Sequence, residues 1–323
     1  MEEFAKDIYG FLESCGLYIY KVRSGYGFES ISVSDASGQD AHPVLLVGIV
    51  ADSLETASVQ QTAASEEISL IRCETGRYPL IVTEDRWKRQ NDAMRLRILS
   101  HLKIFTQVYA RNCEIRRIDK ATAEAFLEQN HSYADAACRY RYGLYLKRHT
   151  GHNALPEAEG PSPHTAGPAA TSTTSSPAAT GNLPAPGTLV AVATFSNARK
   201  WIKGDKTIRS YEWTRYASLP GIRLNGGMGK ILKTFIKEVS PDDIMTYADL
   251  EWSEGKVYEQ LGFSLEDTRP AVTFDIDTAG RRSPIKSAIT ATTPAMASPA
   301  TTGNLYFRNF GSNKYRLKLT DYH

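Results

Sequence analysis

The sequence contains no apolar run approaching the roughly 20 residues that a membrane-spanning helix needs. Its first residues, Met1-Glu2-Glu3-Phe4, lack the basic and apolar segments of a secretory signal. The four cysteines lie far apart with no CxxC pair, which argues against a zinc ribbon and against a disulfide framework. A formal net charge of only +2 implies no particular partner. We therefore expect a cytoplasmic chain with reduced cysteines, no bound metal and no membrane partner.

The length of 323 residues leaves room for two domains, and a hydrophobic content of 41% is typical of globular chains. Residues 1–108 read as a small α/β domain. Its expected elements are a helix from Phe4 that Gly16 ends, strands over 17–22, 43–50, 67–72 and 78–82, and a helix from Thr83 to about His101. The last helix carries a run of basic side chains that could follow a nucleic-acid backbone or form a solvated face, namely Arg86, Lys88, Arg89, Arg95 and Arg97.

Residues 109–323 predict a second domain with a mixed sheet and flanking helices, so the fold class is α/β of the α+β kind. The expected strands cover 109–118, 139–146, 188–195, 210–218, 244–249, 270–276 and 305–319, and the expected helices cover 121–129, the segment after Gly229 and a short turn after Ser253. The strand over 188–195 is apolar on both faces, which is typical of a central strand. We expect it to pair with the strand over 139–146.

Two stretches, at about 149–187 and 284–303, consist mainly of Pro, Ala, Ser, Thr and Gly. Such segments contain too few apolar residues to build a core, so we expect two disordered inserts. Strand patterns stand on both sides of each insert, and long surface insertions cost little stability. We therefore place both inserts in hairpin loops of the second domain.

A glycine-rich segment, Arg223-Leu224-Asn225-Gly226-Gly227-Met228-Gly229-Lys230, runs directly into an amphipathic helix. A helix that begins at glycines presents free N–H groups and the positive end of its dipole without Cβ atoms in the way. The segment therefore predicts an anion cradle. A tight strand-to-helix turn without a ligand would use the same glycines.

The order of strands and helices, together with this glycine loop, resembles the GNAT acyltransferase family. Arg223 to Gly229 is similar to the family's pyrophosphate loop, although it has one extra residue, and Tyr258 to Phe263 is similar to its Tyr-x-x-x-Gly-Phe ending. Glu251 and Glu254 depart from the family's usual Asn and Ala. The resemblance implies a coenzyme site for acetyl-CoA or another acyl-CoA, held by Arg223, Gly226, Gly227, Gly229 and Lys230.

Acyl transfer to an amine needs a group that takes the amine proton and one that protonates the departing thiolate. The resemblance makes Tyr258 the candidate acid, although it could equally be a core tyrosine. Asp249 ends a buried strand and is a candidate base, with a helix-capping aspartate ahead of Glu251 and Ser253 as the alternative reading. His131 is a second candidate base, and lone histidines after helices are more often structural. Arg215 and Tyr216 are expected to line the acceptor groove.

The sequence from Tyr247 to Ser253 resembles that of Mom-type DNA-modification proteins. It also resembles a related domain of phage proteins that follows an endonuclease-like domain. Residues 1–108 contain no Asp…Glu-x-Lys cluster, so we expect at most a degenerate nuclease there. The predicted function is an N-acyltransferase acting on a nucleic-acid base or another amine. The alternative is a non-catalytic DNA-binding or defence-associated module, with DNA or RNA contacted by Arg199, Lys200, the basic helix and the basic residues Lys314, Arg316 and Lys318.

Overall fold

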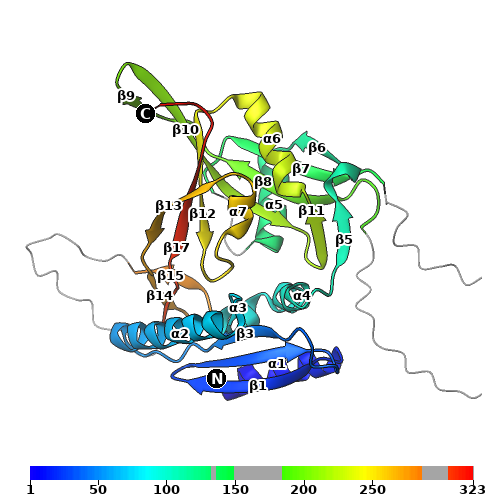
Figure 1. Cartoon of the computed structure of the whole chain (residues 1–323), viewed down its shortest axis with the longest axis vertical. Helices are drawn as coiled ribbons and strands as arrows, with labels where there is room; N and C mark the ends of the chain where they lie inside the picture. Colours follow the sequence, from blue (N-terminus) through cyan, green and yellow to red (C-terminus); the bar gives the residue numbers. More distant parts are fainter. Residues whose placement is uncertain (132–135, 149–183, 286–304, 323) are drawn as a thin grey trace, which may run out of the picture.

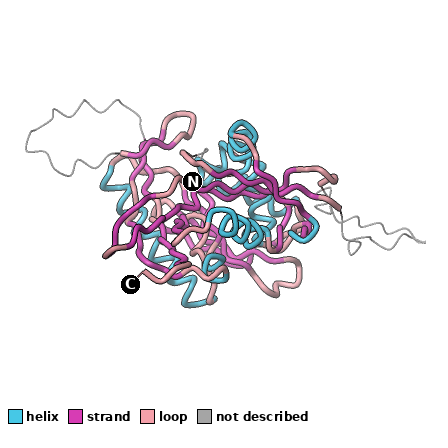
Figure 2. Tube along the Cα trace, turned by 90° about the horizontal axis from the view of Figure 1, so that it is seen from above, coloured by secondary structure: helices cyan, strands magenta, loops and turns pink. Residues whose placement is uncertain are grey.

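The computed structural model describes residues 1–131, 136–148, 184–285 and 305–322. A four-stranded sheet and an eight-stranded sheet form the two main bodies, and two small sheets lie beside them. Figure 1 shows the N-terminal sheet with α2, α3 and α4 between it and the larger body. Figure 2 gives the view from above. The prediction of a mixed α/β chain is confirmed.

The N-terminal unit consists of α1 (Glu2–Ser14), β1 (Tyr18–Gly25), β2 (Phe28–Ser34), β3 (His42–Val47), α2 (Leu54–Thr75), β4 (Leu80–Thr83), α3 (Glu84–Arg89) and α4 (Asn91–His101). Strands β1, β2 and β3 are antiparallel, and β4 lies parallel to β3 after the α2 crossover. Val44 and Leu46 face α1 and α4, whereas Leu45 and Val47 face α2. Both faces of β3 are therefore buried, as its apolar sequence predicts.

Two predictions for this unit are wrong. The strand expected over 67–72 belongs to α2, which begins at a capping box between Ser53 and Thr56 and ends at Gly76 with a left-handed φ of 67°. Ile68 and Ile71 lie three residues apart and are both buried, so helical spacing explains the apolar content. The helix expected over 83–101 is divided at Gln90 into α3 and α4.

The larger body contains β5 (Thr106–Tyr109), β6 (Cys113–Arg117), α5 (Lys120–Asn130), β7 (Tyr140–Leu146), β8 (Leu189–Phe195), β9 (Arg199–Lys203), β10 (Lys206–Ser218), β11 (Ile222–Asn225), α6 (Gly227–Val239), β12 (Asp243–Asp249), α7 (Lys256–Gln260), β13 (Ser264–Arg269), β14 (Thr273–Ile276), β15 (Arg282–Pro284), β16 (Leu305–Arg308) and β17 (Ser312–Lys318). The sheet order is β13-β17-β12-β10-β8-β7-β6, and β9 pairs with the first part of β10. The predicted pairing of β7 with β8 is confirmed.

Strands β10 and β12 form the only parallel pair of the large sheet within the described residues, and they separate part of the way along. They pair from Ser210 to Glu212 on β10 and from Asp243 to Met245 on β12. Beyond this point β10 remains bonded to β8 as far as Ser218, while β12 remains bonded to β17. The carboxyl halves of the two strands therefore diverge, which opens a gap in the middle of the sheet.

Helix α6 crosses from β11 to β12 and fixes the core of this body. Its Phe235 stacks on Phe195 of β8 with ring centroids 3.9 Å apart, and Tyr142 of β7 meets both rings edge-on. All three side chains are fully buried. Aromatic rings of this size supply much of the apolar area that holds a helix on a sheet.

The predicted inserts lie almost entirely outside the described residues. Strands β7 and β8, on either side of the first insert, pair with each other, as expected for an insertion in a hairpin loop. Strands β15 and β16, on either side of the second, do not: each pairs with β14, which lies between them. The expectation of a hairpin is therefore wrong for the second insert, because it assumed that neighbours in sequence are neighbours in the sheet.

The two bodies share part of their apolar core. Strand β5, which follows the N-terminal unit, pairs in parallel with β11 within the larger body. The small β14–β16 sheet packs through Phe274, Ile276 and Phe307 on the apolar cluster that α2 makes with β3 and β4. The N-terminal sheet thus buries one face against residues that lie some 200 positions later in the chain.

A buried ionic network also joins the bodies. Glu251, in the turn after β12, is 1% exposed and accepts hydrogen bonds from Arg86 Nε at 2.6 Å and from Arg282 Nη1 at 2.7 Å. Arg282 also donates to Asp85 at 2.6 Å and to Thr83 Oγ1 at 2.9 Å. Burial alone would raise the pKa of Glu251, but the charges and hydrogen bonds of Arg282 and Arg86 lower it from 4.5 to about 2.

We predict that Glu251→Gln destabilises the protein by about 3–5 kcal/mol at pH 7, since it leaves buried cations without their partner. The carboxylate's contribution is complete above pH 4.5 and is lost as the pH falls towards 2, because its folded-state pKa is the lower one. Urea unfolding at pH 7 and pH 3 measures this effect. Glu2→Gln, which removes an exposed pair with Lys6, serves as the control and should change nothing measurable. An equal loss at both pH values would contradict the pairing.

Candidate functional site

The divergence of β10 and β12 opens into a cavity of about 620 Å³ at the carboxyl ends of both strands. Its walls are β10 from Glu212 to Ser218, β12 from Thr246 to Asp249, the turn that follows β12, and α7. Helix α4 of the N-terminal unit closes one side through Leu96, Arg97 and Ser100. Carboxyl ends of strands at such a switch point are the usual place for a ligand in α/β sheets.

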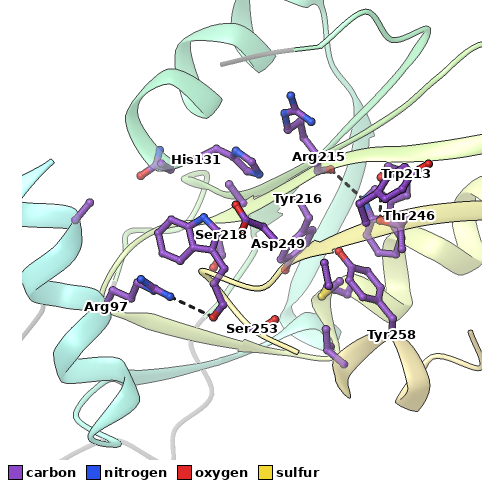
Figure 3. Close-up of a pocket in the computed structure, with 18 of the residues that line it drawn as sticks. Arg97, His131, Trp213, Arg215, Tyr216, Ser218, Thr246, Asp249, Ser253 and Tyr258 are labelled. Atoms are coloured by element: carbon purple, nitrogen blue, oxygen red, sulfur yellow. Dashed lines mark hydrogen bonds between the residues drawn. The ribbon is translucent and has the colours of Figure 1, made fainter. Parts of the chain in front are cut away.

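All three predicted catalytic residues line this cavity. Asp249 comes from the end of β12, Tyr258 from α7 and His131 from the end of α5. Arg215 and Tyr216 of β10, predicted for the acceptor groove, line it as well. Figure 3 shows the five side chains around one space. The structure therefore brings together residues from three separate parts of the chain.

Asp249 has one oxygen engaged in the local turn. Its Oδ1 accepts the backbone N–H of Glu251 at 2.9 Å, and its carbonyl oxygen accepts the N–H groups of Trp252 and Ser253. The alternative reading of Asp249 as a helix cap is wrong, because the next helix begins only at Lys256, with Gly255 as its N-cap, and Asp249 fixes the turn instead. The side chain is half-buried and also lines the cavity.

Two phenols lie on the floor of the cavity. Burial raises the pKa of Tyr258, against the opposing effect of a hydrogen bond with Thr246. Burial also raises the pKa of Tyr216. Both hydroxyls are therefore protonated at neutral pH and able to donate a proton. Trp213, which packs edge-on against both rings, is 2% exposed and belongs to the core.

The glycine loop borders the same cavity, and each of its glycines has a separate reason. Gly226 caps α6 with φ of 76°, a left-handed conformation. A Cβ on Gly227 would lie 2.7 Å from Leu224 and 2.9 Å from Tyr216 Oη, and one on Gly229 would lie 3.3 Å from Leu261. The glycine absent from the family pattern is thus explained by close packing.

The amino end of α6 keeps unpaired backbone donors. The first helical hydrogen bond runs from Lys230 N to Gly226 O, so the N–H groups of Gly227, Met228 and Gly229 have no acceptor within the helix. No side chain caps this end. A hollow of about 460 Å³ over the loop shares Tyr216, Met228 and Val257 with the larger cavity. An anion at the loop would therefore reach the space between β10 and β12.

Arg223 and Lys230, the two cationic residues predicted for the anion cradle, differ in their contacts. Arg223 is exposed, lines the hollow over the loop, and stacks its guanidinium 5.4 Å above the Phe105 ring. Lys230 Nζ donates to the carbonyl oxygens of Ala110 and Cys113, at 2.9 and 2.5 Å. These two hydrogen bonds engage the ammonium group that the sequence assigns to the anion cradle. Lys230 instead ties α6 to the segment between β5 and β6.

The predicted nucleic-acid residues divide into three groups. In the basic helix, Arg86 and Arg97 are enclosed in the contact between the two bodies, and Arg95 stacks on Phe11 and Trp87. Arg86, Arg95 and Arg97 therefore do not form a solvated charged surface. Near the carboxyl terminus, Lys314 and Arg316 pair with Glu266, and Arg316 also pairs with Asp243. Arg199 and Lys200 remain exposed on β9, at the far end of β10 from the cavity.

Sequence reasoning missed the residues through which the N-terminal unit reaches the cavity. Arg97 lies 3.7 Å above the Trp252 ring, and both residues line the cavity. The pattern of α4 suggested a basic face, because a buried arginine and a solvated one look alike in a sequence. The departure of Glu251 from the family's asparagine was the available signal, since an unusual charge next to a buried strand implies a charged partner.

Among the described residues, no group of three His, Cys, Asp or Glu side chains is arranged to hold a metal ion. Within the same residues, no helix is both long and apolar enough to cross a membrane. No protein-family model matches the chain, and no curated protein matches it.

We predict that Gly227→Ala lowers the free energy of unfolding by about 1–2 kcal/mol, because the new methyl group forces Leu224 and Tyr216 to move. Gly10→Ala is the matched control. Gly10 is exposed within α1 with no atom near its missing Cβ, so alanine there should raise stability by about 0.5–1 kcal/mol. Urea unfolding of both variants checks the prediction, and equal effects would show that the loop has room for a side chain.

Proposed function

We propose that the protein is a GNAT-like N-acyltransferase that transfers an acyl group from acyl-CoA, with acetyl-CoA as the simplest donor, to an amine. The observation that carries the proposal is the position of the uncapped amino end of α6 beside the gap between β10 and β12. A diphosphate bound to the N–H groups of Gly227, Met228 and Gly229 would lie at the entrance of a cavity that holds candidate acids and bases. The mixed sheet with flanking helices supports the same proposal.

The residues of the cavity suit the proton transfers of this reaction. As the amine nitrogen bonds to the thioester carbonyl carbon, Asp249 or His131 accepts the proton that the amine loses. As the carbon–sulfur bond breaks, Tyr258 donates its phenolic proton to the departing sulfur. The products are an amide and free CoA, and solvent returns the proton from the base to Tyr258. Tyr216, whose hydroxyl lies beside Gly227, is a second phenol in reach of the coenzyme side.

Isothermal titration with acetyl-CoA tests the proposal. We predict that the wild type binds and that Arg223→Glu binds at least about tenfold more weakly, because reversing an exposed charge at the cradle repels a diphosphate without disturbing the core. Arg89→Glu, an equal charge reversal at an exposed residue of α3, should bind like the wild type. Absence of binding by the wild type, or equal effects of both variants, would overturn the proposal.

A second candidate function, nucleic-acid binding, is favoured by the β9–β10 hairpin. All residues of β9 are exposed, including Trp201 and Ile202 between the basic residues. In the described part of the chain, Arg199, Lys200 and Lys203 form no ion pair. Unpaired cations beside an exposed aromatic side chain suit a phosphate backbone and a base or sugar. A nucleic acid held there could present an amine to the enzyme or could be the protein's ligand in the absence of catalysis.

Fluorescence anisotropy with a labelled 20-base-pair DNA duplex tests this second function at several salt concentrations. We predict salt-dependent binding that the double variant Lys200→Glu/Lys203→Glu weakens by at least about tenfold, with a logarithmic salt slope smaller by about 2. Lys88→Glu/Arg89→Glu reverses two exposed charges on α3 and should leave both quantities unchanged. Equal losses of DNA affinity in the two double variants, or DNA binding that does not depend on salt concentration, would count against the β9–β10 hairpin as the nucleic-acid site.

A further inference from the structure

The loop from Leu250 to Glu254 connects the two candidate catalytic residues, because Asp249 precedes it and Tyr258 follows it one helical turn later. The N-terminal unit holds this loop at successive residues. Tyr78 Oη donates to the carbonyl oxygen of Leu250 at 2.7 Å. Arg97 Nη2 donates to the carbonyl oxygens of Glu251 and Trp252 at 3.0 and 3.2 Å.

Side chains of the loop are held as well. Arg86 and Arg282 bind the buried carboxylate of Glu251, and Arg72 of α2 pairs with Glu254 at 2.8 Å. Three of these partners, Arg72, Arg86 and Arg97, lie on α2, α3 and α4, and Tyr78 lies two residues before β4. The loop is therefore held from outside its own body at Leu250, Glu251, Trp252 and Glu254.

Arg97 illustrates how strongly the loop is held. Its guanidinium donates to Ile81 O at 2.8 Å as well as to the loop, and it stacks on Trp252. Burial, reinforced by the charge of Arg86, lowers the pKa of Arg97 from 12.5 to about 9. Arg97 is half-buried, and taking a guanidinium out of water is costly unless its donors are satisfied, so the position of the loop carbonyls is tightly specified.

We propose that Tyr78 and Arg97 are positioning residues of the site, and that the N-terminal unit works as the support that sets Asp249 and Tyr258 relative to each other in the cavity. The proposal rests on the proposed acyltransferase function for its chemical consequence. Tyr78 does not line the cavity, and its hydrogen bond reaches the site through the loop. Displacements of about 1 Å at groups that position a reaction can cost two orders of magnitude in rate.

The test compares Tyr78→Phe with Tyr20→Phe. Each variant deletes one hydroxyl that donates to a backbone carbonyl oxygen of a loop or turn, since Tyr20 Oη donates to Asp35 O at 2.6 Å, away from the cavity. Amide hydrogen exchange over 250–260 should become roughly 3- to 10-fold faster in Tyr78→Phe and stay unchanged in Tyr20→Phe. Arg97→Lys keeps the charge but loses the paired donors, so it should accelerate amide hydrogen exchange over 250–260 more than Tyr78→Phe does.

The chemical consequence is measured as thiol released from saturating acetyl-CoA with benzylamine as the amine probe. Tyr78→Phe should lower this rate about tenfold while the Kd for acetyl-CoA stays at the wild-type value, because the glycine loop is untouched. Equal exchange rates in the two tyrosine variants, or a parallel loss of acetyl-CoA affinity and rate, would overturn the positioning role. A wild type that binds no acetyl-CoA would overturn the proposed function instead, and hydrogen exchange would still decide whether the N-terminal unit holds the loop.

Discussion

The charge of one buried carboxylate constrains the arrangement of the whole chain. Glu251 lies next to the end of β12 and is closed off from water, so it requires cationic partners inside the protein. Those partners come from α3, 165 residues earlier, and from β15, 31 residues later. Satisfying a single charge therefore fixes the N-terminal sheet, the small β14–β16 sheet and the end of β12 relative to one another. The cavity lies directly beside this junction.

The cavity itself follows from hydrogen bonding within the sheet. After Glu212, β10 has its partner in β8, and β12 has its partner in β17, so neither strand needs the other to satisfy its backbone groups. Trp213, Tyr216 and Tyr258 pack edge-on at this gap, and the cavity opens beside them. The amino end of α6, the carboxylate of Asp249 and two buried phenols meet at this opening.

The sequence predicts those parts of the fold whose signals are local. Helix α6 shows clear helical periodicity, strands β7, β8 and β12 are rich in apolar and aromatic residues, and the glycine loop marks where α6 begins. Strand β2 and the β9–β10 hairpin are not apparent from the sequence, because their serine and lysine side chains interrupt the alternation of apolar and polar residues that marks a strand. The cavity residues Asp249, His131 and Tyr258 were proposed separately, but only the tertiary fold brings them together. The roles of Arg97 and Glu251 depend on contacts more than 150 residues apart, which no local pattern records.

The small β14–β16 sheet has a consequence for synthesis of the chain. All strands of the N-terminal sheet have been synthesised once β4 is made. The apolar cluster of Leu45, Val47 and Ile81, however, is covered in the folded chain by Phe274 and Phe307. At roughly 5–20 residues per second, a ribosome needs on the order of 10–40 s to reach those residues. During that interval the side chains of Phe274 and Phe307 are absent from this cluster. The N-terminal sheet therefore has an incompletely covered apolar face until the last part of the chain has been made.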